Sequence, residues 1–285
     1  MNLFKKVRKK IGDEKRYYQF LYNKTNLSLK DNLNKLGSYK QNSMLRILGN
    51  GKSLNDSLYG FANDADYMVV NKQVLSESFE AIKPKYYVLA DPVFFSRHGR
   101  FDGIRFINQI IDRTKWDMHL FIPYCYVNKE IEELIQKESL IDFVFYNSFS
   151  YYGPEKKRNY CYDHNLAMPS VGNVIVAAIA IGLALKYKEI HLFGVDHDWT
   201  KSIYVDNKNQ VCLEDNHFYK KQDKNGSIVV KNFDGEPYKL HEALKMYTRM
   251  FESYWELKEI ADRYGIRIIN NTQGSFIDAF ERAEV

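Results

Sequence analysis

Apolar runs of strand length that alternate with longer segments of helical spacing constrain the fold of this chain more than any other feature. The expected strands are Met44–Leu48, Asp66–Val70, Tyr86–Ala90, Met118–Ile122, Asp142–Tyr146, Ile190–Val195 and Ile266–Asn270. Strands that alternate with helices favour a parallel sheet covered on both faces. The sequence therefore predicts an α/β fold with a Rossmann-like, mostly parallel, doubly wound sheet.

Two of the helical segments have distinct patterns. Asn173–Lys186 is almost wholly apolar and rich in alanine, which predicts a helix buried between the sheet and its neighbours. The segment from His241 to Tyr264 repeats apolar residues at helical spacing, and Gly265 supplies a C-terminal stop.

The size and composition of the chain fit one large domain with an appendage. Its 285 residues are 45% hydrophobic, enough for a sizeable core. We expect a basic N-terminal arm or helix over residues 1–42 and a catalytic α/β domain over residues 43–285. The three cysteines lack Cys-x-x-Cys spacing, so neither a disulfide framework nor a zinc site is expected. With no secretory signal and no apolar run of about 20 residues, we expect a cytoplasmic protein.

Positive charge is concentrated at the N-terminus. Residues 1–46 contain 12 Lys or Arg and 3 Asp or Glu, whereas the whole chain has a net charge of +5, so the remainder sums to −4. Basic residues mixed with apolar ones between Lys5 and Leu21 predict an amphipathic helix on an anionic membrane surface. A solvated arm, or a helix that packs on a sister subunit, fits the same pattern. Because the remainder is mildly acidic, nucleic acid is not an expected partner.

The first predicted strand ends in a glycine loop, Leu48-Gly49-Asn50-Gly51-Lys52-Ser53, in which Ser53 can cap a following helix. Glycines let the backbone approach an anion, and the N–H groups of a first helical turn point toward it. The loop therefore predicts a phosphate cradle, although many α/β proteins make the same turn without a ligand. It is not a Walker loop, because Arg46 stands where that motif requires glycine.

Polar residues follow nearly every predicted strand. They are Gly49-Asn50-Gly51, Asn71, Asp91-Pro92, Pro123-Tyr124, Asn147-Ser148, Asp196-His197-Asp198 and Asn271-Thr272. Parallel sheets bind ligands at the carboxyl ends of their strands, so these residues predict a polar crevice that can bind a ribose, a base edge or a sugar. Taken singly, each one also fits a strand terminator or turn former.

Residues 199–239 interrupt the alternation with a polar segment. About forty residues without core periodicity after a strand end are typical of a lid or a functional loop. The segment carries Tyr204 and His217, which suit acid/base chemistry over a crevice. A solvated loop whose aromatic residues pack locally is the alternative.

Two Asp-x-Asp sequences offer oxygen ligands for Mg²⁺ or Mn²⁺. Asp64-Ala65-Asp66 precedes a strand, so we expect it to face solvent or to cap a turn. Asp196 and Asp198 follow a strand and can share a cation, because alternate residues of an extended segment face the same way. A strand-end aspartate also commonly caps the next turn, so metal is an alternative and not the expectation.

Two blocks of this sequence resemble the bacterial sialyltransferases of glycosyltransferase family 42. They are Leu48-Gly49-Asn50-Gly51-Lys52-Ser53-Leu54 with Val70-Asn71, and Ser170-Val171-Gly172-Asn173 with Tyr187-Lys188-Glu189-Ile190-His191-Leu192-Phe193-Gly194-Val195-Asp196. The chain is also similar to uncharacterised polysaccharide and flagellin glycosyltransferases, with a pterin diphosphokinase-like branch. The resemblance covers residues 44–275 and implies a sialyltransferase-like, GT-A-related fold.

The resemblance implies a site for a CMP-activated sugar. The residues it assigns to the donor are Gly49, Asn50, Gly51, Ser53, Asn71, Asp91, Ser170, Gly172 and Asp196. Asn50 would meet the nucleotide phosphate or ribose, and Ser170 to Gly172 would lie at the start of the buried helix.

It further implies an inverting reaction that needs no metal and no cofactor other than the donor. His217 would be the general base that takes the proton from an acceptor hydroxyl as that oxygen attacks the anomeric carbon. Tyr204 would hold the departing phosphate by a hydrogen bond. Asp198 replaces a second family tyrosine, which is a departure from the family, and we count it in the expected catalytic group.

The sequence departs from the family at positions that concern the sugar. Ala167, Met168 and Pro169 replace an arginine, and Asp91 replaces an asparagine and adds negative charge. The donor is therefore CMP-linked sialic acid, Kdo or another nonulosonate, or a different nucleotide sugar.

We therefore expect a cytoplasmic glycosyltransferase that builds a bacterial capsule, lipopolysaccharide or other glycoconjugate at the inner face of the membrane. The expected partners are the nucleotide-sugar donor, a glycan acceptor, the membrane surface and further copies of the chain. Two alternatives stay open. One is an Mg²⁺-dependent diphosphokinase-like transfer with the metal at Asp196 and Asp198, and the other is a non-catalytic binding module.

Overall fold

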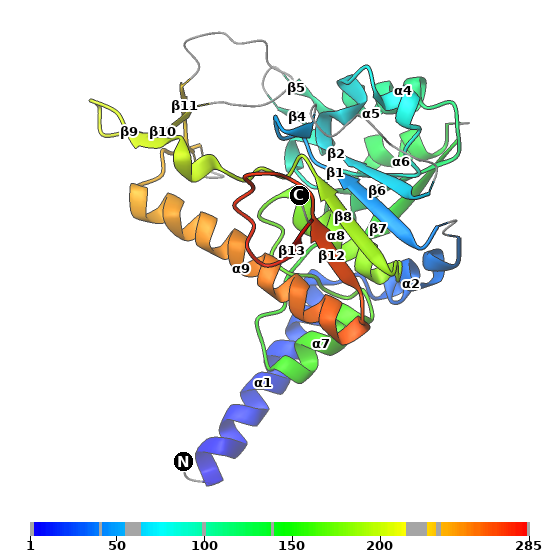
Figure 1. Ribbon diagram of the computed structural model, residues 1–285. Coiled ribbons are helices and arrows are strands. Elements are labelled where there is room, and N and C mark those ends of the chain that lie inside the picture. The colour runs from blue at the N-terminus through cyan, green and yellow to red at the C-terminus, as the bar shows by residue number, and fades with distance from the viewer. Residues whose placement is uncertain are drawn as a thin grey trace.

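An eight-stranded sheet forms the centre of the molecule, with strand order β13-β12-β8-β1-β2-β3-β6-β7 (Figure 1). The computed structural model describes residues 3–39, 42–54, 64–98, 101–137, 140–214, 227–231 and 235–283. Every pair of neighbouring strands in the large sheet is parallel. The predicted parallel α/β fold is confirmed.

All the predicted strands are present, with small shifts at their ends. The strands are β1 (Met44–Leu48), β2 (Asp66–Val70), β3 (Tyr86–Val88), β6 (Met118–Pro123), β7 (Ile141–Tyr146), β8 (Glu189–Phe193), β12 (Arg267–Asn270) and β13 (Glu281–Arg282). The edge strand β13 was not predicted, because two exposed charged residues give no apolar signal.

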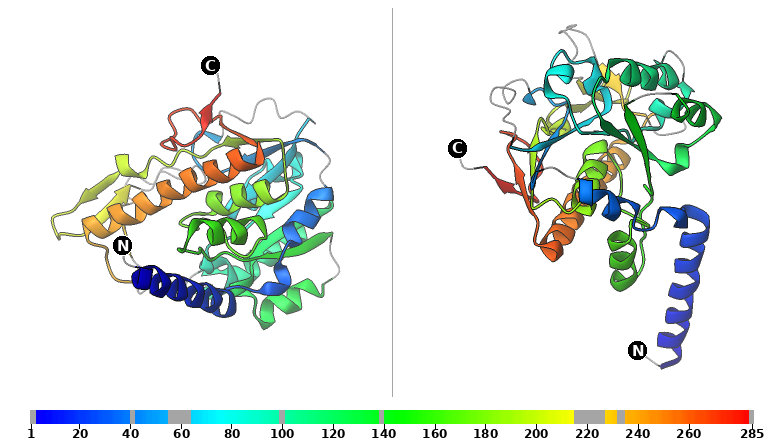
Figure 2. Two further views of the ribbon diagram at one scale, coloured as in Figure 1. Left: turned by 90° about the horizontal axis from the view of Figure 1, so that it is seen from below. Right: turned by 90° about the vertical axis from the view of Figure 1, so that its right-hand side faces the viewer.

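Helices cover both faces of this sheet (Figure 1, Figure 2). The helices of the body are α2 (Asn32–Leu36), α4 (Phe79–Ile82), α5 (Gly103–Arg113), α6 (Lys129–Ile135), α7 (Glu155–Asp163), α8 (Val174–Ala184) and α9 (Leu240–Tyr264), and α1 (Leu3–Lys24) lies apart from them. Alternate strand residues point to opposite faces. Leu45 and Ile47 therefore pack with α8 and α9, whereas Leu48 packs with α4, α5 and α6.

The helix α8 is the buried element predicted over Asn173–Lys186. All its residues but one are buried, and Asn173 caps it by accepting a hydrogen bond from the N–H of Ile175 at 2.8 Å. A Cβ on Gly182 would lie 2.8 Å from Leu45 Cδ2, so a glycine lets α8 lie close to β1. The apolar, alanine-rich composition of this segment made the helix predictable from the sequence.

β1 occupies the point at which the strand order reverses. It pairs with β2 on one side and with β8 on the other, although β8 lies far along the chain. Consecutive strands proceed from β1 toward β7 in one direction and from β8 toward β13 in the other. Such a switch point leaves a crevice at the carboxyl ends of the strands, which is where these sheets bind ligands.

The inserted segment after β8 has structure of its own. Its described part contains β9 (Ile203–Val205), β10 (Val211–Glu214) and β11 (Ser227–Val229), which form an antiparallel sheet with order β11-β10-β9. Val211 and Val230 pack on Ala243 of α9 beneath it. Each strand has only three or four residues, too few to show a strand pattern within a polar segment, so the loop predicted there is partly a small sheet.

Asp66 corrects one expectation of the sequence analysis. It is only 4% exposed, and its carboxylate accepts hydrogen bonds from the Tyr187 hydroxyl at 2.5 Å and from Asn42 Nδ2 at 2.9 Å. Asp64 alone faces solvent, where it pairs with Arg46 at 3.2 Å. The two aspartates cannot bind one metal ion together, because the carboxylate of Asp66 is buried and that of Asp64 faces solvent.

The basic N-terminal segment forms α1, which projects from the body of the molecule (Figure 1, Figure 2). The chain that follows it is anchored by two buried asparagines. Asn147 accepts from the N–H of Asn26 at 2.8 Å, and Asn165 Oδ1 accepts from the N–H of Leu33 at 3.2 Å. Among the described helices, none is both long and apolar enough to cross a membrane.

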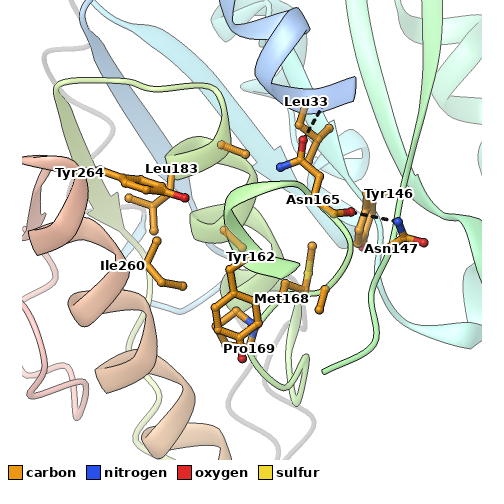
Figure 3. Close-up of a pocket in the computed structure, with 13 residues that line it drawn as sticks. Leu33, Tyr146, Asn147, Tyr162, Asn165, Met168, Pro169, Leu183, Ile260 and Tyr264 are labelled. Atoms are coloured by element: carbon orange, nitrogen blue, oxygen red, sulfur yellow. Dashed lines mark hydrogen bonds between the residues drawn. The ribbon is translucent and has the colours of Figure 1, made fainter. Parts of the chain in front are cut away.

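A small cavity beside these asparagines is structural. Figure 3 shows Asn147 and Asn165 on its wall, joined by a hydrogen bond of 2.9 Å from Asn147 Nδ2 to the carbonyl of Asn165. Its volume of about 30 Å³ is suited to water and not to a substrate.

Candidate functional site

A cavity of about 760 Å³ opens at the carboxyl ends of the strands, beside the switch point at β1. Residues that follow β1, β2, β3, β6, β7 and β8 line it, together with the N-terminus of α8, the insertion and α9. The volume lies within the usual range for cavities that bind small molecules. The predicted polar crevice is therefore present as a single large cavity.

The structure brings most of the predicted site residues together. Those that line the cavity are Asn50, Gly51, Asn71, Asp91, Ser170, Gly172, Asp196 and Asp198. Gly49 and Ser53 lie behind its wall and do not line it. Tyr204 lies on β9, 38% exposed, and is not a lining residue. His217 lies outside the described residues.

The N–H groups of the two glycines in the loop after β1 take part in backbone hydrogen bonds. The N–H groups of Gly49 and Gly51 donate to the carbonyls of Phe193 and Gly194, each at 2.8 Å, so neither is available to an anion. A Cβ on Gly51 would lie 1.7 Å from Asp196 Oδ2, and one on Gly49 would lie 2.3 Å from the carbonyl oxygen of Gly194. The glycines are required because the loops after β1 and β8 pack against each other.

Asp196 connects these two loops. It is 9% exposed, and its Oδ2 accepts a hydrogen bond from the Ser53 hydroxyl at 2.9 Å. The cap role predicted for Ser53 stays a prediction, because the segment that follows Leu54 lies outside the described residues. Together Ser53 and Asp196 hold the loops after β1 and β8 in one wall of the cavity.

Asn50 and Asn71 line the cavity, and each has a side-chain oxygen that is buried without a hydrogen-bond partner. Asn50 Nδ2 donates to the carbonyl of Val70 at 3.1 Å, which fixes the amide and leaves Oδ1 buried with no donor among the described residues. Asn71 has a left-handed backbone, with φ of 48°, and its Oδ1 is likewise buried and unpartnered. A buried polar atom without a partner is costly. A hydrogen-bond donor would stabilise either atom.

The N-terminus of α8 presents the opposite polarity. Asn173 Nδ2 is buried without an acceptor, while its Oδ1 accepts from the N–H of Ile175 and from the Tyr254 hydroxyl. Gly172, Asn173 and Val174 line the cavity. A helix N-terminus carries a partial positive charge, so this wall favours an anionic or acceptor group.

A hydrogen-bonded chain leads from Asn173 to His197 through Tyr254 of α9. The Tyr254 hydroxyl lies 3.1 Å from Asn173 Oδ1 and 2.9 Å from His197 Nδ1. Asn173 Oδ1 can only accept, so Tyr254 gives it its single proton. His197 Nδ1 must then carry the hydrogen that it donates to Tyr254, which leaves Nε2 with a lone pair.

His197 stays neutral in this position. Burial lowers its pKa to about 3, and the nearby Asp198 carboxylate opposes that effect only in part. The ring is 8% exposed and stacks on Trp199 at 4.5 Å between ring centroids. His197 lines the cavity, and no described residue hydrogen-bonds its Nε2. It is thus a fixed hydrogen-bond acceptor and a weak base.

The charge of the cavity wall is mostly negative. Asp91, Asp196 and Asp198 line it against the single ammonium of Lys52 among the described lining residues. Asp198 pairs with Lys52 at 3.5 Å and with Lys201 at 3.6 Å. Asp91 caps a short helical turn by accepting from the N–H of Val93 at 3.0 Å.

No metal cluster accompanies Asp196 and Asp198. Within the described parts of the chain, no group of three or more His, Cys, Asp or Glu side chains is arranged to hold an ion. One carboxylate is bound to a hydroxyl and the other to two ammonium groups. Magnesium can still bind through one or two carboxylates when a substrate phosphate supplies further ligands.

The far rim of the cavity follows β6 and β7 and is aromatic. Tyr126, Phe149 and Tyr152 line it with the exposed thiol Cys125 and with Ser148. Tyr152 is 77% exposed and Phe149 is 36% exposed. Flat aromatic faces beside hydroxyl groups suit the faces and hydroxyls of a sugar.

Several contributors were not assigned from the sequence. His197 belongs to a polar segment after a predicted strand, and Asn173 begins a predicted helix. Only their polarity indicated that they could belong to the site. Tyr254 gave no signal, because it reads as one more apolar position of a long helix and lies 81 positions from Asn173.

No protein-family model and no curated protein sequence matches this chain. Among solved structures, the chain is similar to the apo form of an alpha-2,3-sialyltransferase from Campylobacter jejuni. The sequence identity is 17% and the TM-score is 0.45, over 86% of this chain and 81% of that chain.

Proposed function

We propose that this protein is a glycosyltransferase that moves a sugar from a nucleotide-activated donor to a glycan acceptor. The observation that carries this proposal is the cavity of about 760 Å³ at the switch point, whose walls hold unpartnered amide atoms of both polarities. A nucleotide sugar combines hydroxyl donors with phosphate acceptors, so it can satisfy both walls. We take the donor to be a CMP-linked nonulosonate, such as sialic acid or Kdo.

The polarity of the walls supports one direction for the bound donor. Asn50 Oδ1 and Asn71 Oδ1 are acceptors, so we place the ribose hydroxyls there and not the phosphate. Asn173 Nδ2 and the N-terminus of α8 are donors, so we place the phosphate there. The sugar then extends toward the aromatic rim.

We further propose that the insertion completes the catalytic group. In this scheme His217 takes the proton of the acceptor hydroxyl, and Tyr204 donates a hydrogen bond to the leaving phosphate. Asp198 orients Lys52 and Lys201, which it already contacts, toward the phosphate side. The reaction is inverting, needs no metal, and takes place in the cytoplasm.

A thermal-shift panel tests nucleotide binding. CMP, UDP, GDP and ATP are each added to the full chain with and without Mg²⁺. A ligand that binds only the folded state raises the melting temperature, and a hundredfold excess over Kd contributes about 2.7 kcal/mol. We expect CMP to stabilise the protein without metal.

The variant Asn173→Asp sharpens this test. The carboxylate keeps the acceptor for Ile175 and Tyr254, and aspartate is a good helix cap, but the donor Nδ2 becomes a negatively charged oxygen. We expect CMP affinity to fall about tenfold or more, since one charged hydrogen bond contributes about 1.5–3 kcal/mol. Equal CMP binding by the variant would refute the phosphate placement.

Other outcomes of the panel favour the rivals. A response to ATP that requires Mg²⁺ would favour a diphosphokinase-like enzyme with metal at Asp196 and Asp198. No response to any nucleotide would favour a non-catalytic module. Transfer of sugar from a CMP donor that survives EDTA would exclude both.

A further inference from the structure

The projecting helix α1 carries an exposed apolar stripe. Ile11 and Tyr18 are each 64% exposed, and Tyr22 is 89% exposed. These positions are seven and four residues apart, so their side chains lie along one face of the helix. No aromatic contact joins Tyr22 to another described residue, and Tyr18 meets only the ring of Tyr17. Among the described residues, the stripe is therefore a surface without an aromatic partner from another element.

The opposite face of α1 packs on the rim of the cavity. Tyr17 and Phe20 contact the ring of Tyr151 at 5.6 and 5.1 Å between centroids. An ion pair of 2.6 Å between Glu14 and Lys157 secures the same face. Lys24 Nζ lies 5.1 Å from the ring centroid of Phe149. Phe149, Ser150 and Tyr152 line the cavity, so the rim segment is held between α1 and the site.

The charge of α1 selects the kind of partner. Residues 3–24 contain eight Lys or Arg and two Asp or Glu, a net charge of +6, while the rest of the chain sums to −1. Both acidic side chains are already paired, Asp13 with Arg16 and Glu14 with Lys157. The surface that an apolar stripe on a helix of net charge +6 fits best is an anionic one.

We infer that α1 binds an anionic lipid surface through the stripe of Ile11, Tyr18 and Tyr22, and thereby holds the cavity rim close to the membrane. The rim lies on the other side of the helix. Its distance from the lipid headgroups is therefore one helix diameter, about 10 Å. A glycan acceptor attached to a lipid can reach the aromatic rim across that distance. This last step rests on the proposed function, whereas the lipid contact does not.

A second copy of the chain fits the stripe less well. Two α1 helices paired through their stripes would bring two net charges of +6 together, which is repulsive. An anionic bilayer carries the opposite charge, so a helix of net charge +6 is attracted to it. Self-association through α1 is accordingly an outcome that contradicts the inference.

Vesicle sedimentation tests the inference with the full chain and no nucleotide. The protein is mixed with vesicles of phosphatidylcholine alone or of phosphatidylcholine with phosphatidylglycerol. We expect binding only to the anionic vesicles and weakening as salt is added. Lys10→Gln with Lys15→Gln should weaken binding about 25-fold, because each basic residue near the surface contributes about fivefold.

The stripe itself is tested by Ile11→Ser with Tyr18→Ser and Tyr22→Ser. These side chains are exposed, so the variant should keep the melting temperature of the wild type while vesicle binding falls by at least tenfold. The matched control is Leu244→Ser with Trp255→Ser on α9, whose side chains are 44% and 50% exposed. Its vesicle binding should equal that of the wild type.

A separate fluorescence measurement tests which face of the molecule contacts the vesicle. An environment-sensitive fluorophore is attached to Tyr22→Cys in a Cys125→Ser background, since Cys161 and Cys212 are buried. It should brighten on anionic vesicles, whereas the same fluorophore on Glu77→Cys, beside α4 at the opposite end of the molecule, should not (Figure 1). Similar brightening at both sites would contradict the inference.

Two further results would overturn it. One is vesicle binding that the stripe variant leaves unchanged. The other is a dimer in solution that the stripe variant abolishes, with no binding to anionic vesicles. Because no nucleotide is present, either result leaves the proposed reaction in the cavity standing, and failure of the nucleotide panel leaves the lipid contact standing.

Discussion

His197 shows how burial fixes the state of one residue. Its ring is enclosed by Trp199 and Tyr254, and burial lowers its pKa to about 3. In the unfolded chain the pKa of a histidine is about 6.5. Between these values the unfolded state binds a proton that the folded state does not.

We predict that this histidine destabilises the protein as the pH falls below about 6.5. The free energy of unfolding is highest above that pH, and His197 alone should lower it by about 2 kcal/mol at pH 5. The measurement is urea unfolding of the wild type and of His197→Gln between pH 5 and pH 8. The variant should show the smaller pH dependence. Parallel pH profiles would refute the neutral assignment.

Tyr254→Phe is a second prediction about the same chain of hydrogen bonds. The phenylalanine ring can keep the edge contact with Phe280, but His197 Nδ1–H loses its acceptor. We expect the free energy of unfolding to fall by about 1–3 kcal/mol, the cost of a buried donor without a partner. Tyr22→Phe, whose side chain on α1 is 89% exposed, is the control and should change stability little.

At the scale of the element, Gly51 allows the loops after β1 and β8 to pack closely. Gly51→Ala would drive a Cβ to within 1.7 Å of Asp196 Oδ2 and 2.7 Å of the Gly194 carbonyl oxygen. The loops after β1 and β8 must separate to admit it, so we predict a loss of about 1–3 kcal/mol in unfolding free energy.

Gly172→Ala is the matched control for that prediction. Its Cβ would meet Met250 Cβ at 3.4 Å, an ordinary contact, and its backbone is not left-handed. We expect no loss, and a gain of up to about 1 kcal/mol from the stiffer unfolded chain. Equal losses in the two variants would mean that the close approach of the loops is not what requires Gly51.

The same loop marks how far sequence reasoning reached. A strand, a glycine turn and a polar crevice followed from the residues themselves and are present. The predicted phosphate cradle stays a prediction, because the helical turn after Leu54 lies outside the described residues, while the N–H groups of Gly49 and Gly51 bind carbonyls of β8 and its following loop. Local sequence shows that a turn needs glycine, but it does not show which distant segment packs against it.

At the scale of the whole molecule, the reactivity of the Cys125 thiol can be used to measure whether the cavity is occupied. It is exposed and lines the cavity, whereas Cys161 and Cys212 are buried. We predict that a thiol reagent labels one cysteine quickly in the native protein and all three after unfolding. The rate will be slower than for a free cysteine, since partial burial raises the pKa of Cys125.

A bound nucleotide should slow this labelling by the factor 1 + [L]/Kd if the occupied cavity is fully protected. The Kd obtained in this way should match the value from thermal shifts. Labelling that is indifferent to every nucleotide, in a protein that the same nucleotides stabilise, would place their binding site elsewhere.

The parallel sheet and the buried helix α8 were predictable because each has a local signature, one in strand-length apolar runs and the other in alanine-rich apolarity. The chain from Asn173 through Tyr254 to His197 was not. Its members come from α8, α9 and the loop after β8, and they meet only when the sheet order is known. Pairing between distant segments is a tertiary property that periodicity does not encode.

The pairing of β1 with β8 has a consequence for the growing chain. The hydrogen bond between Ser53 and Asp196 joins residues 143 positions apart, and the edge of β1 that receives β8 has no other described partner strand. A ribosome adds about 5–20 residues per second, so β1 waits on the order of ten seconds for β8 to be made. During that interval an apolar parallel strand keeps an open edge that invites wrong pairing. Synthesis of this protein therefore has a defined period of exposure to aggregation, which closes when the same strand that completes the cavity emerges.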